Sequence, residues 1–296
     1  MISAAEWAWQ RQSVWSQTAN KLKAGPSRAR TAQLILTVAA AVLALAASQA
    51  KGASFPASLT LSVLGALALA AVGLLAVQTS KEQVQRWTRA RSVSEAIKTE
   101  VYTYLTQSGR YEAANRDAVL DAEIKRLEDE AGDLAGYTRG IQPVKRALPP
   151  VHDVDSYLLV RVREMQLRDY YEKNARILET RIRWLKWAQI ALALVAAALA
   201  AVASVSPSVG AWAAVATTAG GAVAAYFATE RYEFLWIEYS RTASELRRLL
   251  DRRTAPDGRQ LSGAELVSEC EQVISVQNQA WRAKWGEEDS SPGQGG

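Results

Sequence analysis

The chain has 296 residues, of which 49% are hydrophobic and 22% charged, and its net charge is +5. A single cysteine, Cys270, and a single histidine, His152, exclude an internal disulfide framework, a cysteine- or histidine-rich zinc site and Cys–His catalysis within one chain. We expect Cys270 to be a core residue. We expect the positive charge to orient the protein at an anionic membrane surface and not to bind nucleic acid.

Two long stretches of the chain carry no charge, although the mean hydropathy of the whole is only -0.10. One lies between Lys51 and Lys81 and the other between Lys186 and Glu230. Stretches this long and apolar exceed the needs of a soluble core and predict membrane spans. The polar, Trp-rich N-terminus does not have the form of a signal peptide.

Residues 1–24 predict an amphipathic helix. Ser3 and Glu6 have the spacing of a capping box, and helical spacing puts five side chains near one face: Trp7, Val14, Trp15, Thr18 and Leu22. Two interpretations remain open for this face, which either packs on the protein's own helices or lies flat on the lipid surface. We expect Gly25-Pro26 to break the helix.

The first membrane hairpin is predicted from spans at about 32–50 and 57–77. The 19 residues of the first span reach about 29 Å, roughly one hydrocarbon thickness. Lys51-Gly52 forms the turn, and Pro56 falls in the first turn of the second span, where proline is tolerated. Basic residues flank the pair on both outer sides: Lys21, Lys23, Arg28 and Arg30 before it, and Lys81, Arg86, Arg89 and Arg91 after it.

The second hairpin repeats this plan, with spans at about 187–205 and 209–229 and an uncharged turn at 206–208. By the positive-inside rule, both turns face outward, and both termini and the central region face the cytoplasm. Aromatic residues typical of membrane interfaces lie near the span ends: Trp184, Trp187, Trp212, Tyr226 and Tyr232. We therefore expect a multi-pass protein of the bacterial inner (plasma) membrane.

The remaining segments predict long helical extensions in the cytoplasm. Helices are expected at 81–107, 111–134, 231–253 and 262–285, and a long one runs from Asp153 into the third span. Ser262 and Glu265 again have capping-box spacing. We expect helices 81–107 and 231–253 to continue the second and fourth spans without interruption and to pack on 153–186. The seam of that packing would be Leu158, Val162 and Met165, at i, i+4 and i+7.

An internal repeat divides the chain into two units. Arg91, Ser94 and Glu95 follow the first hairpin in an R-x-x-S-E pattern, and the pattern recurs 150 positions later: Arg241, Ser244 and Glu245. Its matching place behind each hairpin indicates a duplicated unit. We predict units at 1–140 and 153–286, joined by a Pro-rich linker at 141–152 and followed by a flexible tail at 287–296.

No charged residue falls inside any predicted span, which argues against proton-coupled transport. There is no Glu-x-x-His motif, P-loop or dinucleotide fingerprint. We therefore expect no enzyme activity, no catalytic or metal-binding residues and no cofactor.

Small residues and two threonines in the fourth span form a candidate face for a pore or for helix packing: Ala216, Thr217, Thr218, Gly220, Gly221 and Ala224. Small residues four apart allow helices to approach closely in lipid. The face either packs within one chain or packs between subunits and turns its threonines to a pore.

The stretch Trp9–Lys23, with Trp15 and Asn20, and the stretch Arg91–Tyr104, with Ser94 and Glu95, resemble the SLATT superfamily of bacterial two-transmembrane domains. The resemblance covers nearly the whole chain, with 1–140 similar to one unit and 153–286 to a second. In that family a membrane hairpin is followed by a cytoplasmic helix.

The resemblance implies a bacterial conflict or defence role as a pore-forming effector of the inner membrane. It also implies a trigger from a cytoplasmic sensor or a nucleotide second-messenger system. The leading hypothesis is thus a homo-oligomeric, channel-like membrane effector with the lipid bilayer and its own copies as partners. The alternative is a membrane-anchored helical scaffold that recruits cytoplasmic partners. A membrane-embedded enzyme lacks candidate residues.

Overall fold

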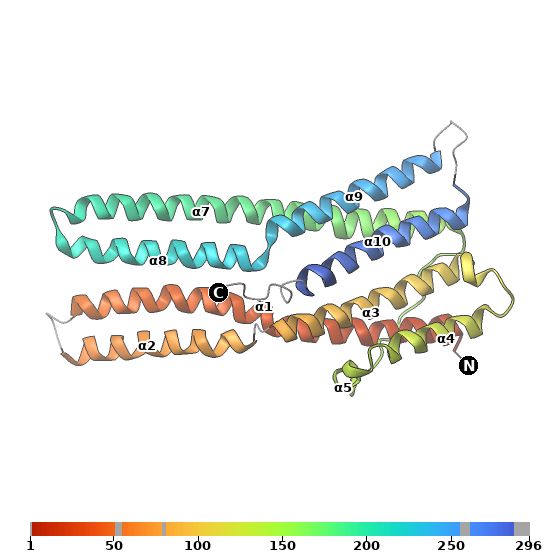
Figure 1. Cartoon of the computed structure of the whole chain (residues 1–296), viewed down its shortest axis with the longest axis horizontal. Coiled ribbons are helices and arrows are strands. Elements are labelled where there is room, and N and C mark those ends of the chain that lie inside the picture. The colour runs from red at the N-terminus through yellow and green to blue at the C-terminus, as the bar shows by residue number, and fades with distance from the viewer. Residues whose placement is uncertain (1, 51–54, 79–80, 255–260, 287–296) are drawn as a thin grey trace, which may run out of the picture. The chain divides into compact units, whose positions relative to one another are not determined.

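Helices make up nearly the whole structure, a computed structural model that describes residues 2–50, 55–78, 81–254 and 261–286. The main helices, labelled in Figure 1, are α1 (Ala4–Ala50), α2 (Phe55–Gln78), α3 (Lys81–Leu105), α4 (Arg116–Asp129), α5 (Ala135–Thr138), α6 (Val154–Tyr157), α7 (Lys173–Ala203), α8 (Pro207–Glu230), α9 (Tyr232–Thr254) and α10 (Gly263–Gly286). A π-helical stretch, η3 (Leu158–Glu172), joins α6 to α7, and short 3-10 turns lie at Gly109–Tyr111 and Gly132–Leu134. These ranges contain no strand, which confirms the predicted all-α class.

The chain divides into two compact units. The span unit comprises Ala24–Ser80 and Arg176–Trp236, and the globular unit comprises Met1–Lys23, Lys81–Ala175 and Ile237–Gly296. Each compact unit draws helices from both predicted sequence units, so the division in space differs from the division along the chain. The duplication itself stays a prediction.

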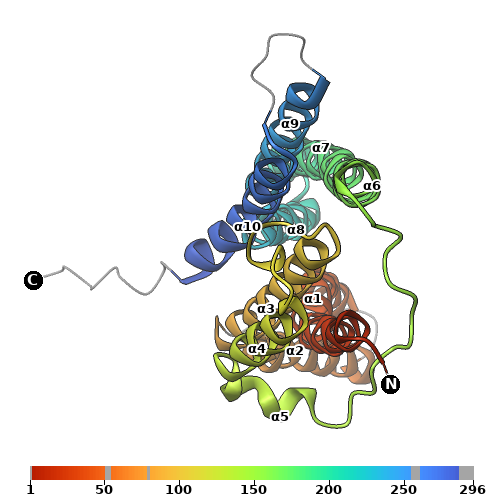
Figure 2. The same cartoon turned by 90° about the vertical axis from the view of Figure 1, so that its right-hand side faces the viewer.

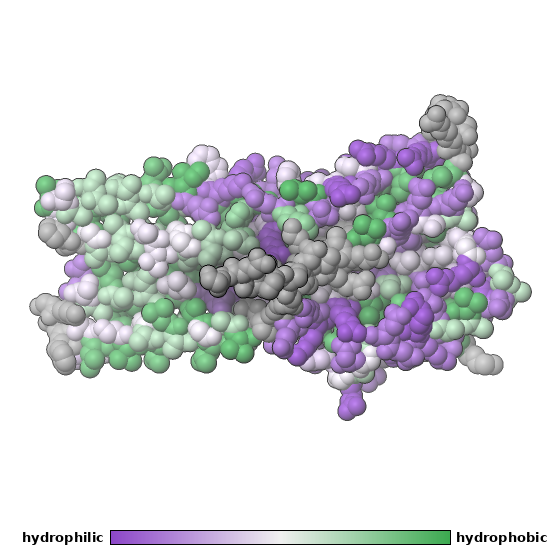
Figure 3. Space-filling model, viewed as in Figure 1, coloured by the Kyte–Doolittle hydropathy of each residue, from purple (hydrophilic) through white to green (hydrophobic). Residues whose placement is uncertain are grey.

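Four helices are long and apolar enough to cross a membrane, as predicted. On the face that Figure 3 shows, apolar residues predominate over the span unit and hydrophilic ones over the globular unit. The first span ends with α1 at Ala50, and α8 begins at Pro207, in the first helical position that suits proline. The expected turn at Lys51-Gly52 lies outside the described residues.

The expected break at Gly25-Pro26 is wrong, because α1 runs through both residues from Ala4 to Ala50. Proline removes one backbone donor, and its ring clashes with the residue before it. Gly25 has no Cβ, which removes part of that clash. The ring of Pro26 is buried, so packing stabilises the helix at this point.

The expected continuity between the fourth span and the next helix is also wrong. α8 ends at Glu230, Arg231 adopts a left-handed conformation with φ 51° and ψ 37°, and α9 starts at Tyr232. No glycine or proline marks this position, so no local signal in the sequence predicts the break. The corresponding junction after the second span lies outside the described residues.

The predicted packing seam of Leu158, Val162 and Met165 is confirmed for two of its three residues. Leu158 and Val162 are buried, but Met165 is 37% exposed, and Leu167 is buried in its place. The reason is the i→i+5 bonding of η3, which widens the turn. Its buried side chains therefore recur every four or five positions, which the α-helical spacing could not predict.

The N-terminal part of α1 packs inside the globular unit. Its buried side chains are Ala5, Ala8, Trp9, Gln12, Ser13, Val14, Trp15, Thr18 and Ala19. Of the two interpretations of this face, packing on the protein's own helices is the one observed. The expected capping box is present, since the amide of Glu6 donates to Ser3 Oγ at 3.2 Å and the amide of Ser3 to Glu6 Oε2 at 2.9 Å.

The segments around the other predicted helices are less regular than expected. The helix predicted at 111–134 is shorter, because α4 covers only Arg116–Asp129 and 3-10 turns lie on either side.

The linker 141–152 runs as an extended chain from α5 towards α6 (Figure 2). α1 holds it, since the amide of Val144 donates to Ser13 Oγ at 2.9 Å. The second capping box is present, with the amide of Ser262 donating to Glu265 Oε2 at 2.9 Å. The predicted tail, 287–296, lies outside the described residues.

Candidate functional site

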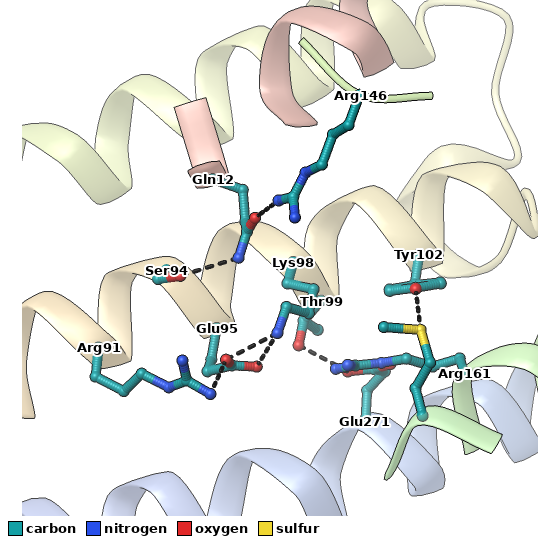
Figure 4. A network of polar contacts seen from close by, with 11 residues as sticks. Gln12, Arg91, Ser94, Glu95, Lys98, Thr99, Tyr102, Arg146, Arg161 and Glu271 are labelled. Atoms are coloured by element: carbon teal, nitrogen blue, oxygen red, sulfur yellow. Dashed lines mark hydrogen bonds and ion pairs between the residues drawn. The ribbon is translucent and has the colours of Figure 1, made fainter. Parts of the chain in front are cut away.

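A buried ion pair between Arg161 of η3 and Glu271 of α10 lies at the centre of the globular unit (Figure 4). The guanidinium donates twice to the carboxylate, from Nε to Oε1 at 3.0 Å and from Nη2 to Oε2 at 3.2 Å. The Tyr157 hydroxyl donates to Oε1 at 3.0 Å, and the Thr99 hydroxyl donates to Oε2 at 2.7 Å. Glu271 therefore accepts four hydrogen bonds, and we call these four residues the hub.

The hub ties α3, α10 and the α6–η3 segment together. Arg161 is fully buried, and its guanidinium lies over the Tyr102 ring at 4.7 Å from the ring centre. Burial alone would raise the pKa of Glu271, but Arg161 and the hydrogen bonds from Thr99 and Tyr157 outweigh it and lower that pKa. The carboxylate stays ionised, so the charge of Arg161 is balanced.

A second polar cluster lies along α3, centred on Glu95. Lys98 Nζ lies 2.8 Å from Glu95 Oε1, and Arg91 Nη2 also lies 2.8 Å from that oxygen. Burial would raise the pKa of Glu95, but these cations together lower it to about 2. Burial likewise lowers the pKa of Lys98, to about 8, against the opposing attraction of Glu95.

The same cluster reaches α1 and the linker. Gln12 donates to Ser94 Oγ at 3.0 Å, and Arg146 donates to the amide oxygen of Gln12. The Arg146 guanidinium also lies over the Trp9 ring, 4.2 Å from its centre. One continuous set of polar contacts thus connects the N-terminal helix, the linker and α3 (Figure 4).

The two copies of the R-x-x-S-E pattern have different environments. In each copy the arginine pairs with the glutamate four positions on, at 2.8 Å for Arg91–Glu95 and 3.1 Å for Arg241–Glu245. The Glu95 side chain is 7% exposed, whereas the Glu245 side chain is 36% exposed. Ser244 donates only to the Ser240 carbonyl, at 3.0 Å. Only the first copy belongs to the buried cluster.

Sequence reasoning missed the hub, yet a signal for it is present. Arg11 lies 150 positions before Arg161, the same offset as in the R-x-x-S-E repeat. Arg11 pairs with Glu128 of α4 at 2.7 Å, and Trp15 donates to the same carboxylate at 2.8 Å. In each half, an arginine that precedes the membrane hairpin therefore pairs with a glutamate on a helix that follows it.

A polar groove of about 560 Å³ lies between α3 and α10, beside the hub. Its charged lining residues are Glu100, Arg110, Glu265 and Glu271, and its other lining is mostly hydroxyl groups and small residues. Three carboxylates against one guanidinium do not suit the phosphates of a nucleotide. The groove is therefore no candidate for the nucleotide trigger that the family resemblance implies.

The candidate face on the fourth span lies on α8. Some of its residues pack inside the hairpin, and the others are exposed. Ala216 is buried, and a Cβ at Gly220 would lie 3.7 Å from Leu192 of α7, so these residues pack within the hairpin. Thr217, Thr218, Gly221 and Ala224 point outward and are exposed. Each threonine hydroxyl donates to the carbonyl four residues back at 2.9 Å, which satisfies it inside the helix.

The outward side of α8 differs from that of α2. Its exposed residues are small or polar: Ala211, Ala214, Thr217, Thr218, Gly221, Ala224, Ala225 and Ala228. Trp212 is the one large apolar side chain exposed among the α8 residues whose side chains are described. Exposed side chains on α2 include small ones too, but several large apolar ones lie among them: Leu59, Val63, Leu64, Leu67, Leu69, Leu74 and Val77. Bulky side chains suit lipid, whereas small residues suit close contact with another helix.

Two protein families match the chain. Residues 157–281 match SLATT_1, the SMODS and SLOG-associating 2TM effector domain 1, and residues 13–118 match DUF4231, a family of unknown function. The first match falls within the second predicted unit and the second within the first. No match was found among the curated proteins or the solved structures.

Proposed function

Because residues 157–281 match the SLATT family of two-transmembrane effector domains, we propose that the chain is a homo-oligomeric membrane effector that opens a pore. Its membrane character rests on four apolar helices. The role in a bacterial conflict system is taken from the description of the matched family. The assembly of several copies of the chain and the passage of ions through them are the steps that we propose.

The outward face of α8 is the observation that carries this proposal. Thr217, Gly221, Ala225 and Ala228 recur at helical spacing on one exposed side. Small side chains make few van der Waals contacts with lipid tails, whereas a second helix can approach such a surface closely and pack against its backbone. We assign this face to contact between copies of the chain. Mostly Ala and Val around two internally bonded threonines would keep a narrow pore dewetted at rest.

The membrane orientation is part of the same proposal. Basic residues gather at the ends of the hairpins that adjoin the globular unit, and the turn at Ser206 carries no charge. The positive-inside rule then places the globular unit in the cytoplasm of a bacterial cell. A trigger from a cytoplasmic sensor would act on the globular unit, whose hub connects helices from both halves of the chain.

Two exposed glycines offer a matched test. A Cβ would meet nothing within 4 Å at either Gly221 on α8 or Gly73 on α2. Leucine at either site therefore fits the monomer, but at position 221 it blocks the proposed subunit contact. We expect Gly221→Leu to reduce dye or ion flux from reconstituted liposomes at least tenfold and to lower the oligomeric mass in detergent.

Gly73→Leu should leave both measurements unchanged, because α2 faces lipid in this arrangement. Equal flux and mass in the parent and both variants would exclude the α8 face as the subunit contact. A parent protein that stays monomeric and never conducts would instead favour the membrane-anchored scaffold.

A further inference from the structure

The fourth span and the helix that follows it meet at a single residue, Arg231. Its left-handed conformation is disfavoured for an L residue, because Cβ comes too close to the following carbonyl oxygen. The amide of Leu235 donates to the Arg231 carbonyl at 3.1 Å, so α9 begins immediately with no connecting loop. One set of backbone angles therefore decides whether α8 and α9 form two helices or one.

Aromatic side chains make contact across the junction. The Tyr226 and Tyr232 hydroxyls lie 3.1 Å apart, and their ring centres are 6.2 Å apart. In an uninterrupted α-helix, residues six apart are separated by about 240° around the axis, so these two rings would point to different sides. The tyrosine pair thus stabilises the bent junction specifically.

Ion pairs fix the acidic residues on both sides of Arg231. Glu230 pairs with Arg30 of α1 at 3.2 Å, and both side chains are largely buried. Glu233 pairs with Lys186 of α7 at 2.6 Å, but both are about half exposed. Solvent screens the second pair, so the Arg30–Glu230 pair contributes more to holding the junction.

We propose that Arg231 is a one-residue hinge with two positions. In the left-handed position seen here, the chain bends between α8 and α9. In the right-handed position, the two become one continuous helix, and the Tyr226–Tyr232 contact breaks. In the effector proposed above, on which this last step rests, the bent junction is the resting state, and straightening transmits a change in the globular unit to the fourth span.

Two substitutions at the same position test the hinge. Arg231→Gly and Arg231→Ala both remove the arginine side chain and all of its contacts. Any difference in structure between the two variants therefore comes from their different backbone preferences at position 231. Glycine adopts the left-handed conformation readily, whereas alanine is the best helix former. Spin labels on the exposed positions 218 and 236, which both lie in the span unit, would measure the result by pulsed EPR in lipid nanodiscs, in a Cys270→Ala background.

A straight helix places the α-carbons of residues 218 and 236 about 27 Å apart, and any bend shortens that distance. We expect the short distance in the parent and in Arg231→Gly, and a new population near the straight value in Arg231→Ala. Glu230→Gln should shift the distribution in the same direction as alanine. Identical distributions for the glycine and alanine variants, or a straight parent, would overturn the hinge.

Gln107, another non-glycine residue in the left-handed region, provides the control. Gln107→Ala and Gln107→Gly change the backbone preference at the end of α3 and should leave the label distance unchanged. Flux measured on the same Arg231 substitutions without labels separates the two proposals. A distance that shifts without any flux would leave the hinge standing and count against the pore.

Discussion

Arg161 and Glu271 are 110 positions apart in the chain, yet the two side chains make a doubly hydrogen-bonded ion pair, at 3.0 and 3.2 Å, that is closed off from water. Removing a charge from water is costly, and the pair recovers that cost only because Thr99 and Tyr157 complete the contacts of the carboxylate. The pair is thus stable as a set and sensitive to the loss of any one member.

The first prediction concerns this pair. Arg161→Met leaves a buried carboxylate without its cation, and we expect a loss of about 3–5 kcal/mol in unfolding free energy, the usual result of breaking a buried pair. Thermal and denaturant unfolding in detergent would measure it. Arg168→Met is the matched control, because Arg168 lies on the same segment and is exposed, so its loss should cost less than about 1 kcal/mol. Similar losses for the two variants would contradict the stabilising role of the hub.

The second prediction concerns pH. The folded-state pKa of Glu95 is lowered to about 2 from a usual value near 4.5. The unfolded chain therefore binds more protons in this window, and the stabilisation is fully present above pH 4.5 and lost as pH falls towards 2. At neutral pH, Glu95→Gln should cost about 3 kcal/mol, from 1.36 kcal/mol per pKa unit.

The difference between the parent and Glu95→Gln should shrink steadily below pH 4.5, followed by unfolding at each pH. Glu245→Gln, at the same place in the second copy of the R-x-x-S-E pattern, removes a more exposed carboxylate and should cost less than about 1 kcal/mol at neutral pH. A constant gap between the parent and Glu95→Gln from pH 7 to pH 3 would contradict the assigned role of this carboxylate.

Features encoded locally could be predicted from the sequence. Both capping boxes and four spans depend on neighbouring residues or on long apolar runs, and these are present as expected. The hub depends on contacts between segments far apart in the chain, which no local pattern reports. The pattern Val267, Cys270, Glu271 and Ile274 nevertheless places Glu271 on an apolar stripe, a signal that a carboxylate is buried.

The incorrect expectations also have physical causes. Gly25-Pro26 has the usual form of a helix break, but packing overrides it, whereas Arg231 breaks a helix with no local signal at all. The candidate face on α8 stays a prediction. Its split into inward Gly220 and outward Gly221 required the position of Leu192 on the neighbouring helix.

The last prediction tests the membrane orientation. Single cysteines at Ser208, beside the second hairpin turn, and at the exposed Asp129 on α4 would report which side of the membrane each occupies. The natural Cys270 does not interfere, because it is fully buried and burial raises its thiol pKa to about 12, which leaves almost no reactive thiolate. In intact cells, an impermeant maleimide should modify Ser208→Cys and spare Asp129→Cys, which becomes reactive once the membrane is opened. Since basic residues flank the hairpins on the side of the globular unit, labelling of Asp129→Cys but not Ser208→Cys would invert the orientation and remove a cytoplasmic trigger from the proposed function.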